Sequence, residues 1–264
     1  MALGNALNQK LVAKIRSSLL LVGPLLSRFK EVTFATPGGC HIGSRPIDTH
    51  LEAFQALGAS IEFDRATGLY HASLTKPILE TVVLKEFSVT ATESLLMAGF
   101  SYPLTIKLAA TEPHVQNLAL FLSHLGAKVS GIGTHTLSIT PHNGMTGEIK
   151  HRIIPDEIEA GTFAVLAAAT KSDISIRGVN PDYLDSVLAK LSEMGVRLEV
   201  KGDALEVFGR RADLKAAKIQ TMIYPGIPTD LQALFAVLAT QAQGTSLIFD
   251  TLYDGRLRYI DQLK

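Results

Sequence analysis

The one cysteine of this chain, Cys40, lies in a loop whose residue types suit acid-base chemistry. Gly38, Gly39 and Gly43 surround it, so little side-chain bulk keeps a ligand away from the backbone. Arg45 adds a fixed cation that can bind an anion or stabilise a thiolate. A lone free cysteine is, however, usually a small buried hydrophobe. The loop therefore predicts either a catalytic thiol or a core residue, and its glycines and arginine favour the thiol.

Asp230 is the second candidate and follows a loop that begins at Tyr224. Pro225 and Pro228 restrict the backbone just before it, so its carboxylate should have a defined direction. Aspartate at the start of a helix is most often an N-cap. A fixed carboxylate can also act as a general base toward a hydroxyl. On the residues alone, the helix cap is the favoured interpretation.

An internal repeat positions these loops. Helix-like segments that open at a proline close at Gly58, Gly126 and Gly195, which are 68 and 69 residues apart. Proline in the first turn and glycine at the end are typical of helix boundaries. Short runs of alternating polarity follow each glycine and predict β-hairpins.

A second helix and strand precede each of these segments. The expected pairs are 15–26 with 32–35, 92–99 with 105–108, 158–169 with 174–176, and, in a fourth copy, 230–241 with 246–249. The repeated order of helix, strand, helix and hairpin predicts an α/β fold with one helix face buried. Residues 162–169 and 231–238 are almost wholly apolar, which indicates helices buried on most sides.

Composition excludes several classes of partner. The chain of 264 residues is 47% hydrophobic and carries 25 basic and 25 acidic residues, so no basic excess suggests nucleic acid or an anionic membrane. The apolar run at 18–26 is too short to span a bilayer, and we expect no secretory signal. One cysteine fits a reducing cytoplasm. Without metal-ligand spacing, a P-loop or a dinucleotide fingerprint, we predict no metal and no cofactor.

Taken together, the loops at 37–46, 154–156 and 228–230 resemble those of the UDP-N-acetylglucosamine 1-carboxyvinyltransferase family. The resemblance extends along essentially the whole chain, including segments 16–18, 23–26, 112–113, 131–134 and 160–162. That family transfers the enolpyruvyl group of phosphoenolpyruvate to the 3-hydroxyl of UDP-N-acetylglucosamine and releases phosphate, the first committed step of peptidoglycan synthesis. The resemblance implies the same transferase activity and the same two small-molecule substrates here.

The family fold is an inside-out α/β barrel of repeated subdomains, in agreement with the repeat found independently. By resemblance, residues 1–154 form a partial first barrel domain with the Cys40 loop. Residues 155–264 form a partial second domain with Asp230, and the boundary is near Pro155. The substrate cleft of such proteins lies between the domains.

The resemblance also implies residue roles. Cys40 matches the thiol general acid, and a free thiol is largely protonated at neutral pH. Asp230 matches the carboxylate beside the sugar hydroxyl, which makes it more than a cap. The matching sugar-nucleotide positions are Arg16, Arg45, Pro46, Ile47, Asp48, Thr49, Lys85, Glu86, Phe87, Ser88, Asp230 and Leu252. On the residues alone, Lys85 is a solvated charge and Leu252 an ordinary strand residue.

The chain departs from the family at both ends and at three internal positions. The family's N-terminal subdomain, with a lysine and an asparagine for phosphoenolpyruvate, and its C-terminal subdomain, with an arginine, have no match here, so we expect a fold incomplete at both ends. Inside the matched region, Glu157 replaces a usual arginine, Thr90 a glycine and Thr111 a basic residue. An anion near two phosphorylated substrates is unfavourable, which predicts weaker phosphate binding.

Two alternatives to a working transferase follow from these departures. One is a truncated, weakly active or inactive homologue that still binds the sugar nucleotide. The other is a structural half that self-associates or needs a complementing chain, because open barrels expose apolar edges. Because the phosphate-binding residues of both missing subdomains are absent, we expect any activity of the isolated chain to be far below that of a complete enzyme.

Overall fold

The computed structural model describes residues 7–39, 46–74, 80–141 and 148–263. Cys40 and Arg45, which the sequence predicts to act in the first loop, lie outside the described residues. Of the described residues, those up to Ile153 form one compact unit (unit 1) and those from Ile154 form a second (unit 2). Each unit has a hydrophobic core of its own.

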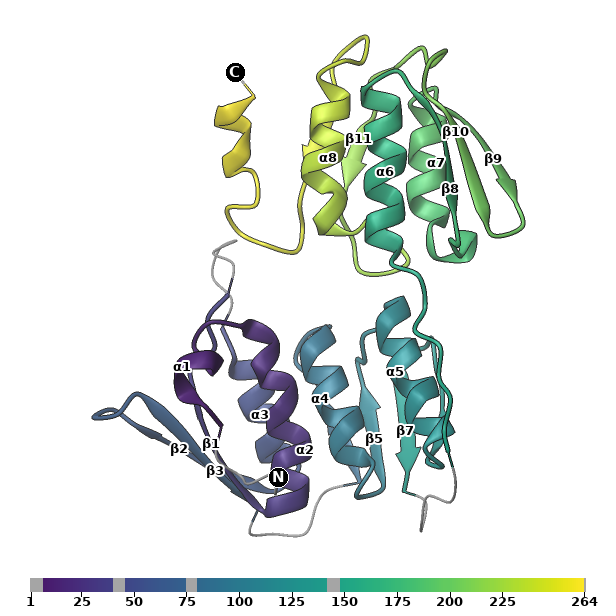
Figure 1. Ribbon diagram of the computed structural model, residues 1–264. Coiled ribbons are helices and arrows are strands. Elements are labelled where there is room, and N and C mark those ends of the chain that lie inside the picture. Colours follow the sequence, from purple (N-terminus) through teal and green to yellow (C-terminus); the bar gives the residue numbers. More distant parts are fainter. Residues whose placement is uncertain (1–6, 40–45, 75–79, 142–147, 264) are drawn as a thin grey trace. The chain divides into compact units, whose positions relative to one another are not determined.

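Unit 1 contains two copies of the repeat (Figure 1). The first copy consists of α1 (Gln9–Val12), η1 (Arg16–Leu21), α2 (Val22–Phe29), β1 (Glu31–Ala35), α3 (Asp48–Ala56), β2 (Ala59–Asp64) and β3 (Leu69–Leu74). The second copy consists of β4 (Thr81–Val83), α4 (Val89–Gly99), β5 (Leu104–Lys107), α5 (Pro113–His124), β6 (Lys128–Ser130) and β7 (Thr136–Thr140). The predicted order of helix, strand, helix and hairpin is confirmed, and β4 is an additional strand.

Each copy in unit 1 builds one sheet. The first sheet has the order β1-β3-β2 and is antiparallel throughout, with Phe34 opposite Tyr70. The second has the order β4-β5-β7-β6, in which β4 runs parallel to β5 and pairs Val82 with Ile106. The predicted hairpins β2-β3 and β6-β7 are both present.

Helix α4 is the centre of unit 1. It contacts α2, α3 and α5, and Leu95 and Leu96 on it are fully buried. Gly23 lets α2 approach closely, because a Cβ at that position would lie 2.3 Å from the carbonyl oxygen of Ser94. The helices therefore form the interior of the unit.

Unit 2 contains the third and fourth copies. The third consists of α6 (Glu157–Ala169), β8 (Asp173–Arg177), η2 (Pro181–Tyr183), α7 (Asp185–Glu193), β9 (Arg197–Lys201) and β10 (Ala204–Phe208). The fourth consists of β11 (Lys218–Gln220), α8 (Thr229–Ala239), β12 (Leu247–Phe249) and η3 (Arg258–Gln262). Strands β8-β10-β9 form an antiparallel sheet, and β11 pairs with β12 in parallel.

Glycine ends the helices as the sequence predicts. Gly58, Gly126 and Gly195 follow the C-cap residues of α3, α5 and α7 and have φ angles of 96°, 100° and 91°. Side chains with a Cβ are strained in this left-handed region, whereas glycine is not. The chain can therefore leave each helix and enter the next hairpin.

Helices α6 and α8 pack closely, since a Cβ on Gly161 would lie 2.6 Å from Cδ1 of Leu231. The expectation that both helices are buried on most sides is confirmed, but each keeps an exposed apolar side chain on its outer face, Val237 in the case of α8. Phe163 and Leu166 on α6 are 44% and 50% exposed. These two residues share one face, whereas α8, β8 and β10 cover the others. Within the described part of the chain, no helix is long and apolar enough to cross a bilayer.

Candidate functional site

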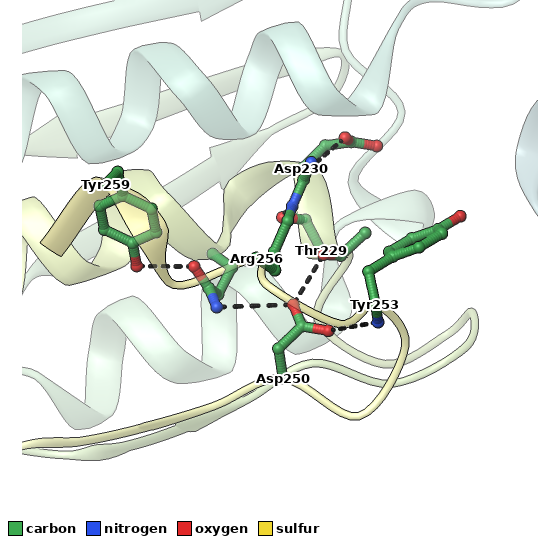
Figure 2. A network of polar contacts seen from close by, with 7 residues as sticks. Thr229, Asp230, Asp250, Tyr253, Arg256 and Tyr259 are labelled. Carbon is green, nitrogen blue, oxygen red and sulfur yellow. Dashed lines mark hydrogen bonds and ion pairs between the residues drawn. The ribbon is translucent and has the colours of Figure 1, made fainter. Parts of the chain in front are cut away.

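Asp230 lies in the first turn of α8, with its carboxylate turned toward Arg256 (Figure 2). The interpretation as a helix cap is wrong. Pro228 occupies the N-cap position, and the helix has no side-chain cap hydrogen bond. Instead, Oδ1 of Asp230 accepts a hydrogen bond from Nη2 of Arg256 at 2.9 Å. The Asp230 side chain is 63% exposed, so its carboxylate is both oriented and accessible.

Arg256 orients this carboxylate from a largely buried position. Its side chain is only 16% exposed. The same Nη2 atom donates to the carbonyl oxygen of Thr229 at 3.1 Å, and the guanidinium lies 6.0 Å from the ring centre of Tyr253. A carboxylate held from one side by a fixed cation can accept a proton from a hydroxyl on its open side. The geometry therefore permits general-base chemistry at Asp230.

Asp250 connects the loop after β12 to the start of α8. Its Oδ2 accepts from the Thr229 hydroxyl at 2.7 Å, and its Oδ1 accepts from the backbone N–H groups of Leu252 and Tyr253 at 2.9 and 3.1 Å. The last two bonds make a tight turn of the kind that aspartate favours. The loop that carries Arg256 is thereby attached to the helix that carries Asp230.

Gln232 and Tyr259 extend this network into the interior. Gln232 is fully buried, and its Nε2 donates to Asp250 Oδ2 at 3.5 Å. The Tyr259 hydroxyl donates to Gln232 Oε1 at 2.6 Å. Burial raises the pKa of Tyr259, and the negative charge of Asp250 raises it further, against the opposing charge of Arg256. Tyr259 therefore remains protonated and acts as a donor.

Leu252 lies in the loop after β12 rather than in a strand, so its interpretation as a strand residue is wrong. Its N–H group is engaged by Asp250. Its side chain is exposed. The hydrogen bonds to Asp250 thus determine the course of the backbone at Leu252.

The remaining described candidates gather in unit 1 at the starts of three helical segments. Arg16 begins η1, and its Nη2 donates to the carbonyl oxygen of Pro46 at 3.0 Å, just before α3. Thr49, in the first turn of α3, donates its hydroxyl to Oε1 of Glu86 at 2.8 Å. Ile47 and Thr49 are buried, whereas Pro46, Asp48 and Glu86 are exposed. The structure thus brings the candidates from all three segments together.

The loop before α4 presents a charge and an aromatic ring. Lys85 is 71% exposed and forms an ion pair with Glu52 at 2.5 Å. The Phe87 ring lies 4.6 Å from that of His135. Ser88 is the N-cap of α4 and accepts from the backbone N–H of Ala91 at 3.4 Å. Lys85 and Phe87 are therefore available to a ligand, and the Ser88 oxygen also caps the helix.

Sequence reasoning missed a buried histidine beside this loop. His50 is 2% exposed, and its Nε2 lies 2.8 Å from the Thr90 hydroxyl. Thr90, which the resemblance marks as a departure from the family pattern, therefore has a structural contact here. A histidine and a threonine 40 residues apart carry no local signal that would predict the contact.

Glu157 and Thr111, the other two positions that the resemblance marks as departures, also fit their local structure. Glu157 is the first residue of α6, where a negative charge is favourable because of the helix dipole. Thr111 is buried, and its carbonyl oxygen accepts from Nε2 of Gln116 at 2.7 Å. Across the described residues, no three His, Cys, Asp or Glu side chains are grouped so that they could hold a metal ion.

Solved structures define the class of fold. The crystal structure of the enolpyruvyl transferase NikO from Streptomyces tendae is similar with a TM-score of 0.81 and 22% identity, over 98% of this chain and 62% of that one. EPSP synthase from Acinetobacter baumannii gives a TM-score of 0.60 and 18% identity, over 93% of this chain and 58% of that one. The fold is that of the enolpyruvyl transferases.

The family model of EPSP synthase (3-phosphoshikimate 1-carboxyvinyltransferase) matches residues 2–264, and the chain belongs to this family. Similar proteins include UDP-N-acetylglucosamine 1-carboxyvinyltransferase 1 of Carboxydothermus hydrogenoformans, 44% identical over 97% of this chain, and UDP-N-acetylglucosamine 1-carboxyvinyltransferase 2 of Bacillus subtilis, 40% identical over 96%. The resemblance predicted from the loops is confirmed. The chain spans 60% and 59% of the lengths of these two relatives.

Proposed function

We propose that this chain transfers the enolpyruvyl group from phosphoenolpyruvate to the 3-hydroxyl of UDP-N-acetylglucosamine, in the cytoplasm and as the first committed step of peptidoglycan synthesis. The names of its curated relatives support UDP-N-acetylglucosamine as the acceptor and carboxyvinyl transfer as the reaction. The observation that carries the proposal is the exposed Asp230 carboxylate, which Arg256 orients at the start of α8.

The reaction needs one acid and one base. Cys40 gives a proton to the terminal alkene carbon of phosphoenolpyruvate. Asp230 takes the proton of the sugar hydroxyl while the sugar oxygen bonds to the central carbon of phosphoenolpyruvate. The bond from that carbon to the phosphate oxygen then breaks. The Cys40 thiolate takes a proton back from the methyl group, which restores the alkene and the thiol, and the proton held by Asp230 goes to the departing phosphate, so the enolpyruvyl ether remains.

The positions that the resemblance matches bind the sugar nucleotide. Arg16, Arg45 and Lys85 provide cations for the diphosphate. The backbone at Leu252 faces the sugar amide, beside the carboxylate of Asp230. The other contacts come from Pro46, Ile47, Asp48, Thr49, Glu86, Phe87 and Ser88.

Isothermal titration of the full chain with UDP-N-acetylglucosamine, followed by a phosphate-release assay with phosphoenolpyruvate, tests the proposal. We expect binding and phosphate release in the wild-type chain, binding without release in Asp230→Asn and Cys40→Ser, and wild-type behaviour in Asp254→Asn. Cys40→Ser should also abolish alkylation, since the chain has one cysteine. Binding without release in the wild-type chain would favour a sugar-nucleotide-binding homologue, and absence of binding would overturn the proposal.

A further inference from the structure

The single carboxylate of Asp250 accepts hydrogen bonds from two elements, α8 and the loop after β12. It accepts hydrogen bonds from the Thr229 hydroxyl of α8 and from the N–H group of Tyr253 in its own loop (Figure 2). It also accepts from the Gln232 amide of α8 and from the N–H group of Leu252. An ionised carboxylate is an acceptor only and can take about four such donors. Each of the four contacts therefore depends on the same charged group.

The loop between Asp250 and Arg256 is attached to the start of α8 at both ends. Asp250 holds its beginning through the Thr229 hydroxyl, and Arg256 holds its end through the Thr229 carbonyl oxygen and Asp230. Leu252 lies between these two attachments. Its backbone position relative to Asp230 is therefore set by hydrogen bonds that Asp250 accepts.

The contacts inward from Asp250 also have a fixed direction. Tyr259 donates to Oε1 of Gln232, which leaves the Gln232 amide nitrogen to donate to Asp250. Gln232 is fully buried, so its amide cannot turn without losing both partners. An acceptor at position 250 thus keeps the hydrogen bonds from Tyr259 to Gln232 and from Gln232 to Asp250 in one direction.

We propose that Asp250 is a positioning residue for the transfer reaction, an inference that rests on the proposed function. It fixes the loop backbone at Leu252 relative to the Asp230 carboxylate, so that a sugar contacted by the backbone presents its hydroxyl to the carboxylate. Asp250 acts through Leu252 and Thr229 and takes no proton itself.

Variants of the full chain separate positioning from simple stability. Asp250→Ala removes all four contacts. Asp250→Asn keeps an oxygen that accepts from the loop N–H groups, but its amide nitrogen then faces the donating nitrogen of Gln232. In the double variant Asp250→Asn with Gln232→Glu, the amide and the carboxylate exchange places, and a donor again faces an acceptor. Asp254→Asn is the matched control, because Asp254 is an exposed carboxylate on the same loop. Titration with UDP-N-acetylglucosamine, thermal unfolding and amide hydrogen exchange are measured for each protein.

We expect Asp250→Ala to weaken binding by about tenfold relative to Asp254→Asn, the scale of a lost charge-assisted hydrogen bond. The exchanged pair should recover most of the affinity that Asp250→Asn loses. Equal affinities for Asp250→Ala and Asp254→Asn, or no recovery in the exchanged pair, would overturn the inference. Affinity that falls only in step with the unfolding temperature would also overturn it.

The same measurements distinguish failure of this inference from failure of the proposed function. If the wild-type chain does not bind the sugar nucleotide, that function falls, and hydrogen exchange decides the role of Asp250. Faster exchange of the Leu252 and Tyr253 amides in Asp250→Ala than in Asp254→Asn, reversed in the exchanged pair, would support the positioning of the loop. Equal exchange in all variants would refute it.

Discussion

Arg256 holds both the side chain of Asp230 and the backbone beneath it with a single nitrogen atom. Nη2 lies 2.9 Å from Oδ1 of Asp230 and 3.1 Å from the carbonyl oxygen of Thr229. The aspartate end of this contact is largely in water, whereas the arginine end is largely buried. Since exposed ion pairs contribute little to stability, the contact serves mainly to orient the carboxylate.

The first prediction concerns this pair. In a double-mutant cycle of Arg256→Met and Asp230→Asn, the coupling energy should be about 0.5 kcal/mol, because Asp230 is well solvated. Arg256→Met alone should lower the free energy of unfolding by about 1–2 kcal/mol, since the Thr229 carbonyl also loses its donor. Urea unfolding of the four proteins measures both values. A coupling energy above about 2 kcal/mol would make the pair a structural element instead.

The second prediction concerns Glu93 on α4, whose pKa is raised because the helix packing buries its carboxyl group. The negative charge of Glu112 raises it further, and His114 opposes both effects. A raised folded-state pKa means that the folded protein favours the neutral acid. The stability that this group contributes is complete below its unfolded pKa and is lost as pH rises through the folded pKa.

Glu93→Gln should therefore stabilise the chain more at pH 7 than at pH 4, a range that begins near the unfolded value of about 4.3. Thermal unfolding of wild type and variant at both pH values measures the difference. Glu148→Gln, which removes a carboxylate at an exposed position before unit 2, is measured in parallel as the control. An equal effect of Glu93→Gln at both pH values would contradict the raised pKa.

The third prediction tests the contact between α6 and α8. Gly161→Val places side-chain atoms where Leu231 Cδ1 lies, and both residues are buried. Overpacking of this kind costs about 1–3 kcal/mol of unfolding free energy. Ala189→Val adds methyl groups to an exposed position of α7 and should cost much less. If the two variants unfold at the same urea concentration, the close packing of these helices is not important for stability.

The sequence predicts the repeated elements well because their signals are local. Proline, glycine and the alternating runs mark helix starts, helix ends and hairpins within a few residues. Strands β4 and β11 were missed, since each has three residues and exists only through parallel pairing with a strand later in the chain. The exposure of Phe163 was missed as well, because apolar composition does not tell which neighbours a helix has.

In the candidate site, too, the sequence predicts individual residues from local signals but not the contacts that join distant segments. Asp230 could be selected from its loop and from a resemblance, but its contact with Arg256 joins residues 26 positions apart. Asp250 does have a local signal, since an aspartate followed by a turn after a strand is typical of the hydrogen bonds it makes to Leu252 and Tyr253. Its contact with Thr229 requires the fold.

The last prediction concerns Lys85, which forms an ion pair with Glu52. Both side chains are more than one-third exposed, so the pair is worth no more than about 1 kcal/mol and a diphosphate can replace Glu52. Lys85→Ala should weaken binding of UDP-N-acetylglucosamine by about tenfold at low salt, and less at about 0.5 M salt because exposed charges are screened. Lys128→Ala, which removes an exposed lysine from β6, should bind like wild type at both salt concentrations. Titrations of the three proteins at both salt concentrations measure this, and a salt-independent loss in Lys85→Ala would indicate that Lys85 shapes its loop instead of meeting the diphosphate.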